Sequence, residues 1–364
     1  MFENIYKGKR VLITGHTGFK GSWLCSWLLD LGATIAGYSV DIPTEPSHFH
    51  TLGLSDKIEH FNGDVRIKNT LQKVINQFCP DIVFHLAAQS IVRKSYENPV
   101  LTLETNSIGT LNLLDCLQNQ PSVIATVLIT SDKCYENVEW LWGYRENDRL
   151  GGKDPYSASK ACAEIISKVY MESFYDEKGP ALATARAGNV IGGGDWALDR
   201  IVPDCIRAWS KKEEVVIRNP KATRPWQHVL EPLSGYLVLG QKLLQGNLEV
   251  RNQSFNFGPP ATVNQSVDGL ISEMAQYWSG SKWKFENDAN SGKPESALLK
   301  LNCDKAIHML KWGPVLDFPE TIRMTGEWYQ TFYSEKSPSI EAFTRKQIQE
   351  YVKSATQKNL SWIK

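Results

Sequence analysis

The stretch that decides the fold is Val11–Gly21, which reads VLITGHTGFKG. Its first residues are uniformly apolar, as in a strand buried on both faces of a parallel sheet, and a helical pattern follows its last glycine. Three glycines at a G-x-x-G-x-x-G spacing let the backbone turn tightly, approach a pyrophosphate and pack the helix closely on the sheet. The helix N-terminus then directs its free amides at the phosphates. The stretch predicts a dinucleotide-binding turn; the alternative is a glycine-rich strand-to-helix turn that binds nothing.

Apolar runs typical of strands alternate with helical patterns through the first half of the chain. Because this alternation requires right-handed crossovers, it predicts an α/β fold with a doubly wound parallel sheet of the Rossmann type. A ligand crevice is expected at the carboxyl ends of the strands. The expected strands are Arg10–Thr14, Thr34–Ser39, Ile58–Phe61, Asp81–His85, Thr126–Ser131 and Leu182–Ala187, and the expected helices are Phe19–Leu31, Lys68–Phe78, Pro99–Gln118 and Tyr156–Phe174.

The pattern changes after Asn189 to a glycine run, frequent prolines and shorter elements. A chain of 364 residues is also longer than single cores usually become, about 250–300 residues. We expect residues 1–190 to form mainly the dinucleotide-binding domain and 191–334 mainly a smaller substrate-binding lobe, interleaved with the first. Residues 335–364 are expected to be a C-terminal extension, either helical or partly disordered.

The composition excludes several classes of protein. Lys+Arg and Asp+Glu both number 40, so no overall charge attracts nucleic acid or an anionic membrane. The 7 cysteines are scattered without a C-x-x-C pair, which argues against a disulfide framework or a zinc site and favours a reducing compartment. No apolar leader segment and no run long enough for a membrane span is seen, so we expect a cytoplasmic protein.

Two aspartates follow predicted strands where a dinucleotide would lie. Asp41 comes 20 residues after the last glycine of the turn, where an acidic residue accepts hydrogen bonds from the adenosine ribose. Its carboxylate would repel a 2′-phosphate, and residues 39–47 contain no Lys or Arg, so NAD is favoured over NADP. The alternative is a turn-forming aspartate before Pro43. Asp64, after the third strand, is expected near the adenine.

Tyr156 and Lys160 form a Y-x-x-x-K pair, which places both side chains on one helix face. A nearby ammonium group stabilises a phenolate and lets the tyrosine act as a base. Such a pair also arises by chance, but this one follows a good helix start at Asp154 and lies 25 residues after Ser131 at a predicted strand end. The serine can bind the same substrate hydroxyl that the tyrosine deprotonates.

The glycine loop, ribose acid, strand-end serine and Y-x-x-x-K pair occur in an order that resembles the extended short-chain dehydrogenase/reductase family, whose members act largely on nucleotide sugars. The resemblance covers most of the chain. Four blocks are similar to the sugar-nucleotide 4,6-dehydratases that act on CDP-glucose, whereas dehydratases acting on dTDP-glucose usually have Thr-Asp-Glu where this chain has Ser131-Asp132-Lys133. The four blocks are Thr14–Trp23, Ser131–Asn137, Ala185–Trp196 and Thr223–Pro232.

The resemblance implies a hydro-lyase that converts CDP-glucose to CDP-4-keto-6-deoxyglucose, with NAD as a recycled cofactor, for deoxysugar biosynthesis of the O-antigen type. In the implied mechanism Tyr156 removes the 4-hydroxyl proton, and Ser131 and Lys160 orient the reacting groups. We expect Asp132 to assist the leaving hydroxyl and Lys133 to handle the carbon 5 proton. The alternative for these two residues is a solvated salt bridge at a strand end.

The site residues implied in this way fall into three groups. The expected catalytic residues are Ser131, Asp132, Lys133, Tyr156 and Lys160. The expected cofactor-binding residues are Gly15, His16, Thr17, Gly18, Phe19, Gly21, Asp41, Asp64, Val65, Leu86, Ala87, Ala88, Tyr156 and Lys160. The expected substrate-binding residues are Gln89, Asn189, Arg200, Arg224 and His228, the two arginines being suited to a diphosphate.

Three further expectations concern metals, a departure from the family and assembly. No ligand partner stands at metal-binding spacing from His228, so no metal is expected. Pro294-Glu295-Ser296 stands where the family often has His-Glu-Ala, which leaves a substrate contact there open. Amphipathic helices at Pro99–Gln118 and Tyr156–Phe174 are suited to a four-helix dimer face, so a homodimer or homotetramer is expected.

Two other functions remain open on the sequence. A sugar-nucleotide 4-epimerase uses the tyrosine and NAD but needs no proton carriers beside Ser131. A dinucleotide-sensing regulatory protein would keep the fold and lose catalysis, although the intact Tyr156/Lys160 pair argues against it.

Overall fold

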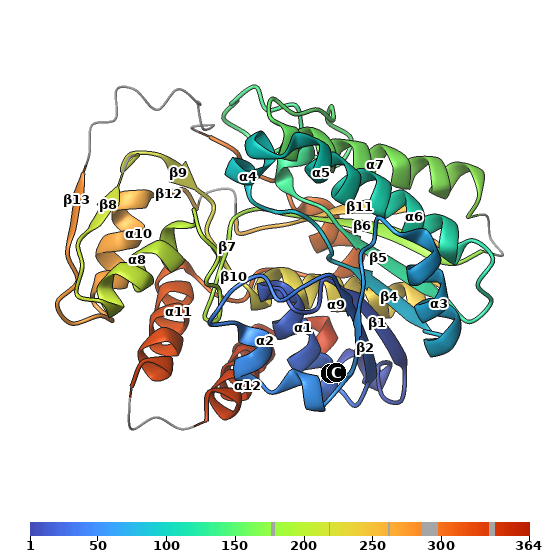
Figure 1. Ribbon diagram of the computed structural model, residues 1–364, viewed down its shortest axis with the longest axis horizontal. Coiled ribbons are helices and arrows are strands. Elements are labelled where there is room, and N and C mark those ends of the chain that lie inside the picture. The colour runs from blue at the N-terminus through green and yellow to red at the C-terminus, as the bar shows by residue number, and fades with distance from the viewer. Residues whose placement is uncertain (176–178, 218, 261–262, 286–297, 335–338) are drawn as a thin grey trace.

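The computed structural model describes residues 1–175, 179–217, 219–260, 263–285, 298–334 and 339–364. Seven strands form one parallel sheet in the order β11-β6-β5-β4-β1-β2-β3 (Figure 1). The chain reverses its direction of winding between β1 and β4, and ligands of such sheets bind at this point, beyond the carboxyl ends of the strands. The strands are β1 (Arg10–Thr14), β2 (Thr34–Ser39), β3 (Glu59–Asn62), β4 (Ile82–His85), β5 (Ala125–Ile129), β6 (Ala181–Ala187) and β11 (Gln253–Phe257).

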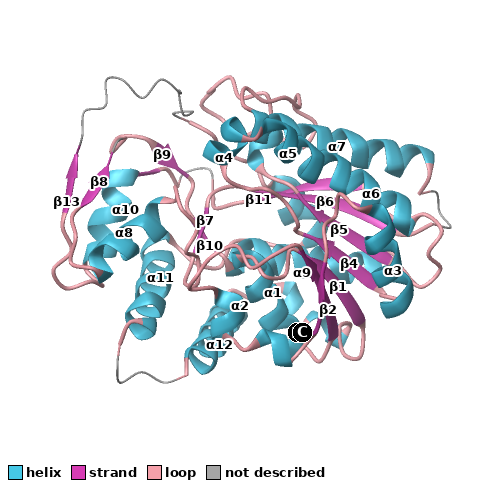
Figure 2. Cartoon of the chain, in the orientation of Figure 1, coloured by secondary structure: helices cyan, strands magenta, loops and turns pink. Residues whose placement is uncertain are grey.

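Side chains of the central strands alternate between two buried cores. Val11 and Ile13 contribute to one core, whereas Leu12 between them contributes to the other. This is the period-two geometry of a strand, and it explains why uninterrupted apolar runs form strands covered on both faces. Figures 1 and 2 show the helical layers. One layer contains α1 (Phe19–Asp30), α9 (Leu230–Leu244) and α12 (Ile340–Gln357), and the other contains α3 (Lys68–Phe78), α6 (Gly109–Leu117) and α7 (Pro155–Ser173).

A smaller group of elements lies beside the sheet, at the left of Figure 1. Its short strands pair as β13 with β8, β12 with β9, and β10 with β7. Nη2 of Arg200 joins this group to the segment after β4 through a 3.1 Å hydrogen bond to Oγ of Ser90. The elements are β7 (Val190–Ile191), α8 (Ile201–Ser210), β8 (Val215–Ile217), β9 (Thr223–Arg224), β10 (Gln227–His228), β12 (Gln265–Ser266), α10 (Val267–Ala275), β13 (Trp283–Phe285) and α11 (Phe318–Phe332).

Residues 339–364 form helix α12 and a final turn that packs against the start of the chain. The rings of Phe2 and Trp362 stack with their centroids 5.1 Å apart. On α12, Oη of Tyr351 donates a 2.9 Å hydrogen bond to the buried carboxylate of Glu231 on α9. Of the two expectations for the C-terminal extension, the helical one is therefore confirmed for these residues.

The six predicted strands are confirmed within two residues at each end. The predicted strand Thr126–Ser131 ends earlier, at Ile129, so Ser131 lies in the turn beyond it. The predicted helix Pro99–Gln118 is not one regular α-helix. Its parts α5 (Pro99–Leu103) and α6 are joined by a π-helical segment, Glu104–Ile108. Helices α2 (His48–Thr51) and α4 (Val92–Glu97) and strand β11 were not predicted.

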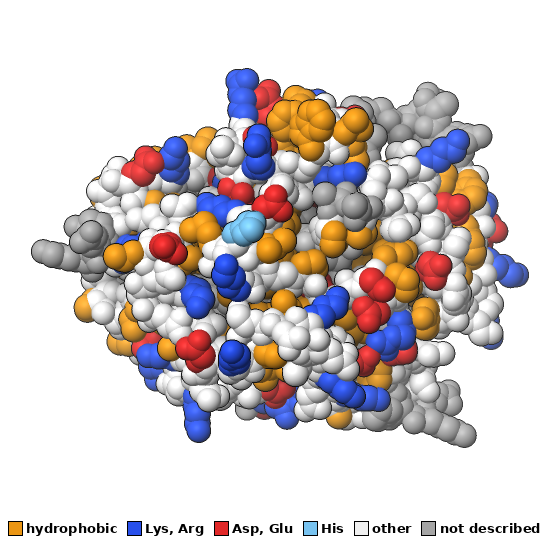
Figure 3. Space-filling view, turned by 180° about the vertical axis from the view of Figure 1, so that it is seen from behind, with side chains coloured by type: hydrophobic (Ala, Val, Ile, Leu, Met, Phe, Trp, Pro, Cys, Tyr) orange, Lys and Arg blue, Asp and Glu red, His pale blue; other side chains and the backbone are white. Residues whose placement is uncertain are grey.

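One face of the molecule carries both signs of charge. On this face, shown in Figure 3, acidic and basic side chains are interspersed. Among the described residues, every helix is too short or too polar to cross a membrane. All seven cysteines are free thiols, and six of them are at least partly buried.

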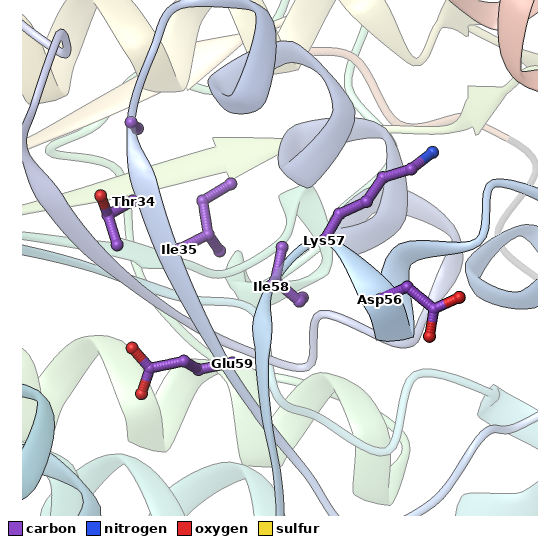
Figure 4. Close-up of a pocket in the computed structure, with 7 residues that line it drawn as sticks. Thr34, Ile35, Asp56, Lys57, Ile58 and Glu59 are labelled. Atoms are coloured by element: carbon purple, nitrogen blue, oxygen red, sulfur yellow. The ribbon is translucent and has the colours of Figure 1, made fainter.

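A hollow of about 380 Å³ lies at the amino ends of β2 and β3 and is shown in Figure 4. It is lined by Ala33, Thr34, Ile35, Asp56, Lys57, Ile58 and Glu59. Because the amino ends of the strands are opposite to the carboxyl ends, this hollow is separate from the predicted ligand crevice.

Candidate active site

The glycine turn between β1 and α1 is shaped for close contact with a ligand. Gly15 has φ +76°, and a Cβ atom there would lie 2.7 Å from the backbone nitrogen of Ala87 after β4. Gly18 is the N-cap of α1 and supplies no capping side chain. The first amides of the helix therefore remain available to an anion, as a bound pyrophosphate requires. A side chain at Gly21 would collide with the carbonyl oxygen of Gly15, at 2.3 Å.

The end of β2 lies directly beside this turn. Oγ1 of Thr17 donates a 2.6 Å hydrogen bond to the carbonyl oxygen of Asp41, and the Asp41 side chain is exposed. This places the predicted ribose acid next to the phosphate-binding turn. The imidazole of His16 is buried between Ser39 and His60, 2.9 Å and 2.7 Å away, and burial lowers its pKa to about 3. Through these two contacts the neutral ring links the turn to β2 and β3.

The remaining predicted cofactor residues lie along the ends of β3 and β4. The carboxylate of Asp64 is paired with Arg66 at 2.6 Å, and Val65 is buried against α6. Leu86, Ala87 and Ala88 are half-buried and follow His85, the last residue of β4. Small side chains at this strand end leave the backbone open to a flat ligand. Phe19 is the first residue of α1 and is half-buried.

The turn after β5 carries the predicted proton carriers. Oγ of Ser131 donates a 2.9 Å hydrogen bond to Oδ1 of Asp132, and the backbone nitrogen of Lys133 donates to the same Oγ at 3.3 Å. Ser131 and Asp132 are both buried. Oδ2 of Asp132 is buried without a hydrogen-bond partner among the described residues, so this acceptor is left unsatisfied by them.

Helix α7 brings the predicted base to this turn. Asp154 caps the helix by accepting a 2.9 Å hydrogen bond from the Ser157 nitrogen, which sets the direction of its first turn. Burial raises the pKa of Tyr156 to about 12, while a hydrogen bond with Ser131 and the charge of Arg200 lower it. Ser131 therefore acts on the ionisation of the predicted base, and the catalytic roles of the two residues stay predictions.

Lys160, the second residue of the predicted pair, bonds the end of β5. Its Nζ donates a 3.3 Å hydrogen bond to the carbonyl oxygen of Ile129. Burial lowers the pKa of Lys160 to about 8. A positive charge that lowers the pKa of Tyr156 is that of Arg200, whose Nη1 lies 2.7 Å from Oδ2 of Asp195. Stabilisation of the phenolate by Lys160 stays a prediction.

Two residues that the sequence analysis did not select lie in the site. Lys20, in the glycine turn, has its Nζ 3.5 Å from Oη of Tyr236. Burial, together with the charges of Arg200 and Lys160, lowers the pKa of Lys20 to about 7, while Asp132 opposes this shift. A basic residue inside a phosphate-binding turn was a signal that could have identified it.

The second such residue is Asn106, in the π-helical segment. Its amide connects Gln89 to helix α7, because Nδ2 donates to the Gln89 carbonyl oxygen at 2.9 Å and to Oγ of Ser159 at 2.8 Å. The Gln89 side chain is itself engaged, with Nε2 donating to Thr102 and Ile91 and Oε1 accepting from the Ile91 nitrogen. These contacts give Gln89 a structural role, and its predicted substrate contact is left without support.

The other predicted substrate residues are Arg200, Asn189, Arg224 and His228, and they come from different elements. The charge of Arg200 lowers the pKa of Tyr156, and Asn189 lies in the turn between β6 and β7. Arg224 belongs to β9, and its Nη1 donates to the Thr223 carbonyl oxygen at 2.8 Å. His228 is fully buried against Trp23. Burial lowers its pKa to about 3, so the imidazole is neutral.

Two tryptophans of the family-like blocks, Trp196 and Trp226, are both buried. Trp196 packs against Trp328, Tyr329 and Phe332, which assigns it to the aromatic core of the smaller lobe. No group of three or more potential metal ligands occurs in the described part of the chain. The motif Pro294-Glu295-Ser296 lies outside the described residues.

Comparisons with known proteins agree with this geometry. Residues 12–325 match the family model described as GDP-mannose 4,6 dehydratase. The chain is 44% identical over 359 residues to a CDP-glucose 4,6-dehydratase from Salmonella typhimurium LT2, covering 97% of this chain and 99% of that protein. Among solved structures, a dTDP-glucose 4,6-dehydratase from Streptomyces venezuelae with NAD and TYD bound gives a TM-score of 0.75 at 20% identity, covering 88% and 97% of the two chains. A UDP-glucose 4-epimerase from Thermotoga maritima with UDP-glucose gives 0.76 at 21% identity, covering 89% and 100%.

Proposed function

Since the chain belongs to the GDP-mannose 4,6-dehydratase family, we propose that it is an NAD-dependent hydro-lyase that converts CDP-glucose to CDP-4-keto-6-deoxyglucose and water. The observation that carries the proposal is the turn Ser131–Lys133, where a buried carboxylate is hydrogen-bonded to the serine that lowers the pKa of Tyr156. A 4-epimerase requires the tyrosine but has no use for an acid and an amine beside it. The choice of CDP-glucose over other nucleotide sugars is supported by the Salmonella typhimurium relative.

The glycine turn, its uncapped helix and Asp41 fit NAD. The amides at the start of α1 would hold the pyrophosphate, and Asp41 would accept hydrogen bonds from the ribose. Bound there, NAD would supply a hydride acceptor for carbon 4 of the sugar and, once reduced, a hydride donor for carbon 6. Dinucleotide without a 2′-phosphate is favoured because the Asp41 carboxylate would repel that group.

The protein's own residues carry the protons. Tyr156 accepts the proton of the 4-hydroxyl, and Ser131 holds the oxygen that becomes the carbonyl. That carbonyl acidifies the hydrogen on carbon 5, which is otherwise not removable. Lys133 takes this proton and later returns it to carbon 5, while Asp132 gives a proton to the departing 6-hydroxyl. Arg200 and Arg224 are assigned to the diphosphate of the substrate.

An assay with four nucleotide sugars tests this function. The purified protein is incubated with NAD and, separately, CDP-, dTDP-, UDP- and GDP-glucose, and the products are followed by nuclear magnetic resonance. A 4-keto-6-deoxy sugar from CDP-glucose is the expected result. Conversion of glucose to galactose without a keto product would make the protein a 4-epimerase. Binding of NAD with no turnover of any sugar would favour the dinucleotide-sensing regulatory protein.

Assembly, domain division and location belong to the same proposal. Apolar side chains are exposed along helices α5 and α7, including Val100, Leu101, Ile165 and Val169. Two copies that cover this face would form a four-helix interface, so we assign the protein to a homodimer or a larger homo-oligomer built from it. Residues 1–190 are assigned mainly to cofactor binding, 191–334 mainly to substrate binding and 335–364 to an extension, in a cytoplasmic enzyme. Light scattering during gel filtration measures the oligomeric state.

A further inference from the structure

The turn Ser131–Lys133 is attached at both ends to one buried ion pair. The pair joins Glu164 on α7 to Arg186 on β6, with Nη2 of the arginine 2.8 Å from Oε2 of the carboxylate. Both side chains are almost wholly buried, with exposed fractions of 2% for Glu164 and 3% for Arg186. The proposed reaction assigns no step to either residue.

The two charged groups bond opposite ends of that turn. Thr130, the residue before it, donates a hydrogen bond from Oγ1 to Oε1 of Glu164. Tyr135, two residues after it, accepts a 2.8 Å hydrogen bond at its phenolic oxygen from Nη1 of Arg186. Thr130 and Tyr135 are buried as well. A displacement of Ser131–Lys133 relative to α7 must therefore stretch or break a hydrogen bond to a buried charge.

The same face of α7 carries the predicted base. Tyr156, Lys160 and Glu164 follow one another at every fourth position, so their side chains lie on one side of the helix. Nζ of Lys160 donates to the carbonyl oxygen of Ile129 at 3.3 Å, and Glu164 accepts from Thr130, the next residue of the chain. Two successive turns of α7 are thus bonded to two successive residues where β5 ends. This double attachment fixes the helix, and Tyr156 with it, against the strand.

We propose that the Glu164–Arg186 pair positions the active site, by holding the turn Ser131–Lys133 in the place relative to Tyr156 that oxidation of carbon 4 requires. This role rests on the function proposed above, which assigns successive steps to groups on the helix and on the turn. Glu164 and Arg186 do not touch the sugar in this role. They act through the residues at the two ends of the turn.

A buried ion pair is better suited to positioning than to stability. Removal of two charges from water can cost as much free energy as their attraction returns, and apolar residues of similar volume are often as stabilising. Charge-assisted hydrogen bonds are short and directional, so they fix the groups that they join. Thr184 and Ser254 also donate to Oε2 of Glu164, at 2.9 Å and 3.4 Å, and hold the carboxylate in one orientation.

The experiment compares two isosteric substitutions that each remove one hydroxyl bonded to Glu164. Thr130→Val detaches the turn from the carboxylate, whereas Thr184→Val detaches only β6. Both hydroxyls are buried, so both variants should unfold at lower urea concentration. Only Thr130→Val should slow the single-turnover reduction of NAD by CDP-glucose, by roughly 10–100-fold, as a misplaced reacting group does. Thr130→Ser keeps the hydroxyl and should restore most of the rate.

Tyr135→Phe repeats the test at the other end of the turn, because it removes the oxygen that accepts from Arg186 and leaves the ring in place. It should also slow the reduction. In each slowed variant the dissociation constants of NAD and CDP-glucose, measured by calorimetry, should stay near those of the unaltered enzyme. The reason is that the glycine turn and Arg224 are untouched, so the loss should fall on the chemical step.

Equal rates in Thr130→Val and Thr184→Val, whether both normal or both reduced, would make the pair a purely structural element and overturn its positioning role. Weaker binding of NAD or sugar that accounts for the slower reaction would overturn it as well. If Thr130→Val does not fold, Tyr135→Phe decides, and a normal rate in that variant rejects the role. Failure of the unaltered enzyme to form a 4-keto-6-deoxy sugar from CDP-glucose would instead contradict the proposed function.

Discussion

Nη1 of Arg200 lies 2.7 Å from Oδ2 of Asp195, and the charge of the guanidinium held in this ion pair lowers the pKa of Tyr156. Arg200 is thereby a fixed positive charge that lowers the pKa of the predicted base. The sequence analysis assigned Arg200 to the substrate diphosphate alone. The structure adds that its charge favours the ionised form of Tyr156.

Arg200→Met should raise the pKa of Tyr156, because the phenolate loses a stabilising charge. The rate of nicotinamide reduction rises with pH as the phenol ionises, so this rise should move to higher pH by about 0.5–1 unit. The measurement is the pH dependence of single-turnover reduction at saturating sugar. Arg93→Met removes an exposed arginine paired with Asp199 and should leave the profile in place. An unshifted profile in Arg200→Met would contradict the assigned influence.

Tyr156→Phe should slow the first hydride transfer by about 10²–10⁴-fold, as expected for loss of a general base. Absorbance of the reduced nicotinamide after mixing with CDP-glucose measures this rate, and calorimetry with NAD checks that binding is retained. Tyr170→Phe removes a hydroxyl from the same helix, where it bonds Asp115 at 3.4 Å, and should react at the normal rate. Normal reduction by Tyr156→Phe would assign the base to another residue.

Lys133→Ala should oxidise carbon 4 and then stop. The reduced nicotinamide should accumulate, because the base that removes the carbon 5 proton is missing while Tyr156 is intact. Stopped-flow absorbance follows the accumulation, and nuclear magnetic resonance of the quenched mixture should show little 4-keto-6-deoxy sugar. Lys153→Ala, an exposed lysine just before α7, is the control and should form product normally. Product at the normal rate from Lys133→Ala would refute its role.

Lys20→Met should remove a pH dependence of stability. Burial lowers the pKa of Lys20 to about 7 from 10.5, so between these values the unfolded chain binds a proton that the folded chain lacks. The free energy of unfolding therefore rises with pH across this window. The substitution should reduce that rise by about 1–2 kcal/mol, less than the full shift implies because the half-buried amine keeps some hydration.

Urea unfolding without cofactor at about pH 7 and about pH 9.5 measures the effect of Lys20→Met. Lys73→Met, at an exposed position of α3, should keep the rise seen in the unaltered protein. The same rise in Lys20→Met would show that the amine is not desolvated.

Tyr351→Phe should weaken attachment of the C-terminal helix. The lost hydroxyl donates to Glu231 and lies 2.9 Å from Oγ of Ser234, both in the core, so about 1–3 kcal/mol of unfolding free energy should be lost. Denaturant unfolding measures it. Tyr96→Phe, at an exposed position of α4, should change little. An unchanged midpoint in Tyr351→Phe would show that the buried carboxylate finds another donor.

Local sequence was sufficient for the cofactor half of the fold. Strands such as β1 and β4 are apolar on both faces, and glycines at fixed spacing have one main structural use, so the sheet and its turn could be predicted. Strand β11, with the sequence QSFNF, alternates with polar residues and lies far from its partner in the chain, so it has no local signal of a central sheet.

The site was predicted as a set of residues but not as a set of contacts. Tyr156 and Ser131 were found because their roles follow from chemistry and spacing. The influence of Arg200 on the pKa of Tyr156 depends on how the smaller lobe packs against the sheet, which no local pattern predicts. Lys20 was overlooked because the glycines around it were sufficient to explain the turn. Asn106 was missed because it lies in a π-helical segment. The helical periodicity of the surrounding sequence does not distinguish this segment from an ordinary α-helix.

Strand β11 also gives the sheet an order of completion during synthesis. Residues 188–252 must leave the ribosome after β6 before β11 can pair with it, an interval on the order of several seconds at usual translation rates. During that time β6 is an open edge whose unpaired amides and carbonyls can recruit a strand from another nascent chain. Strong overexpression therefore increases the danger of misassembly at this edge, and slower translation or a chaperone that occupies the edge should improve the yield of folded enzyme.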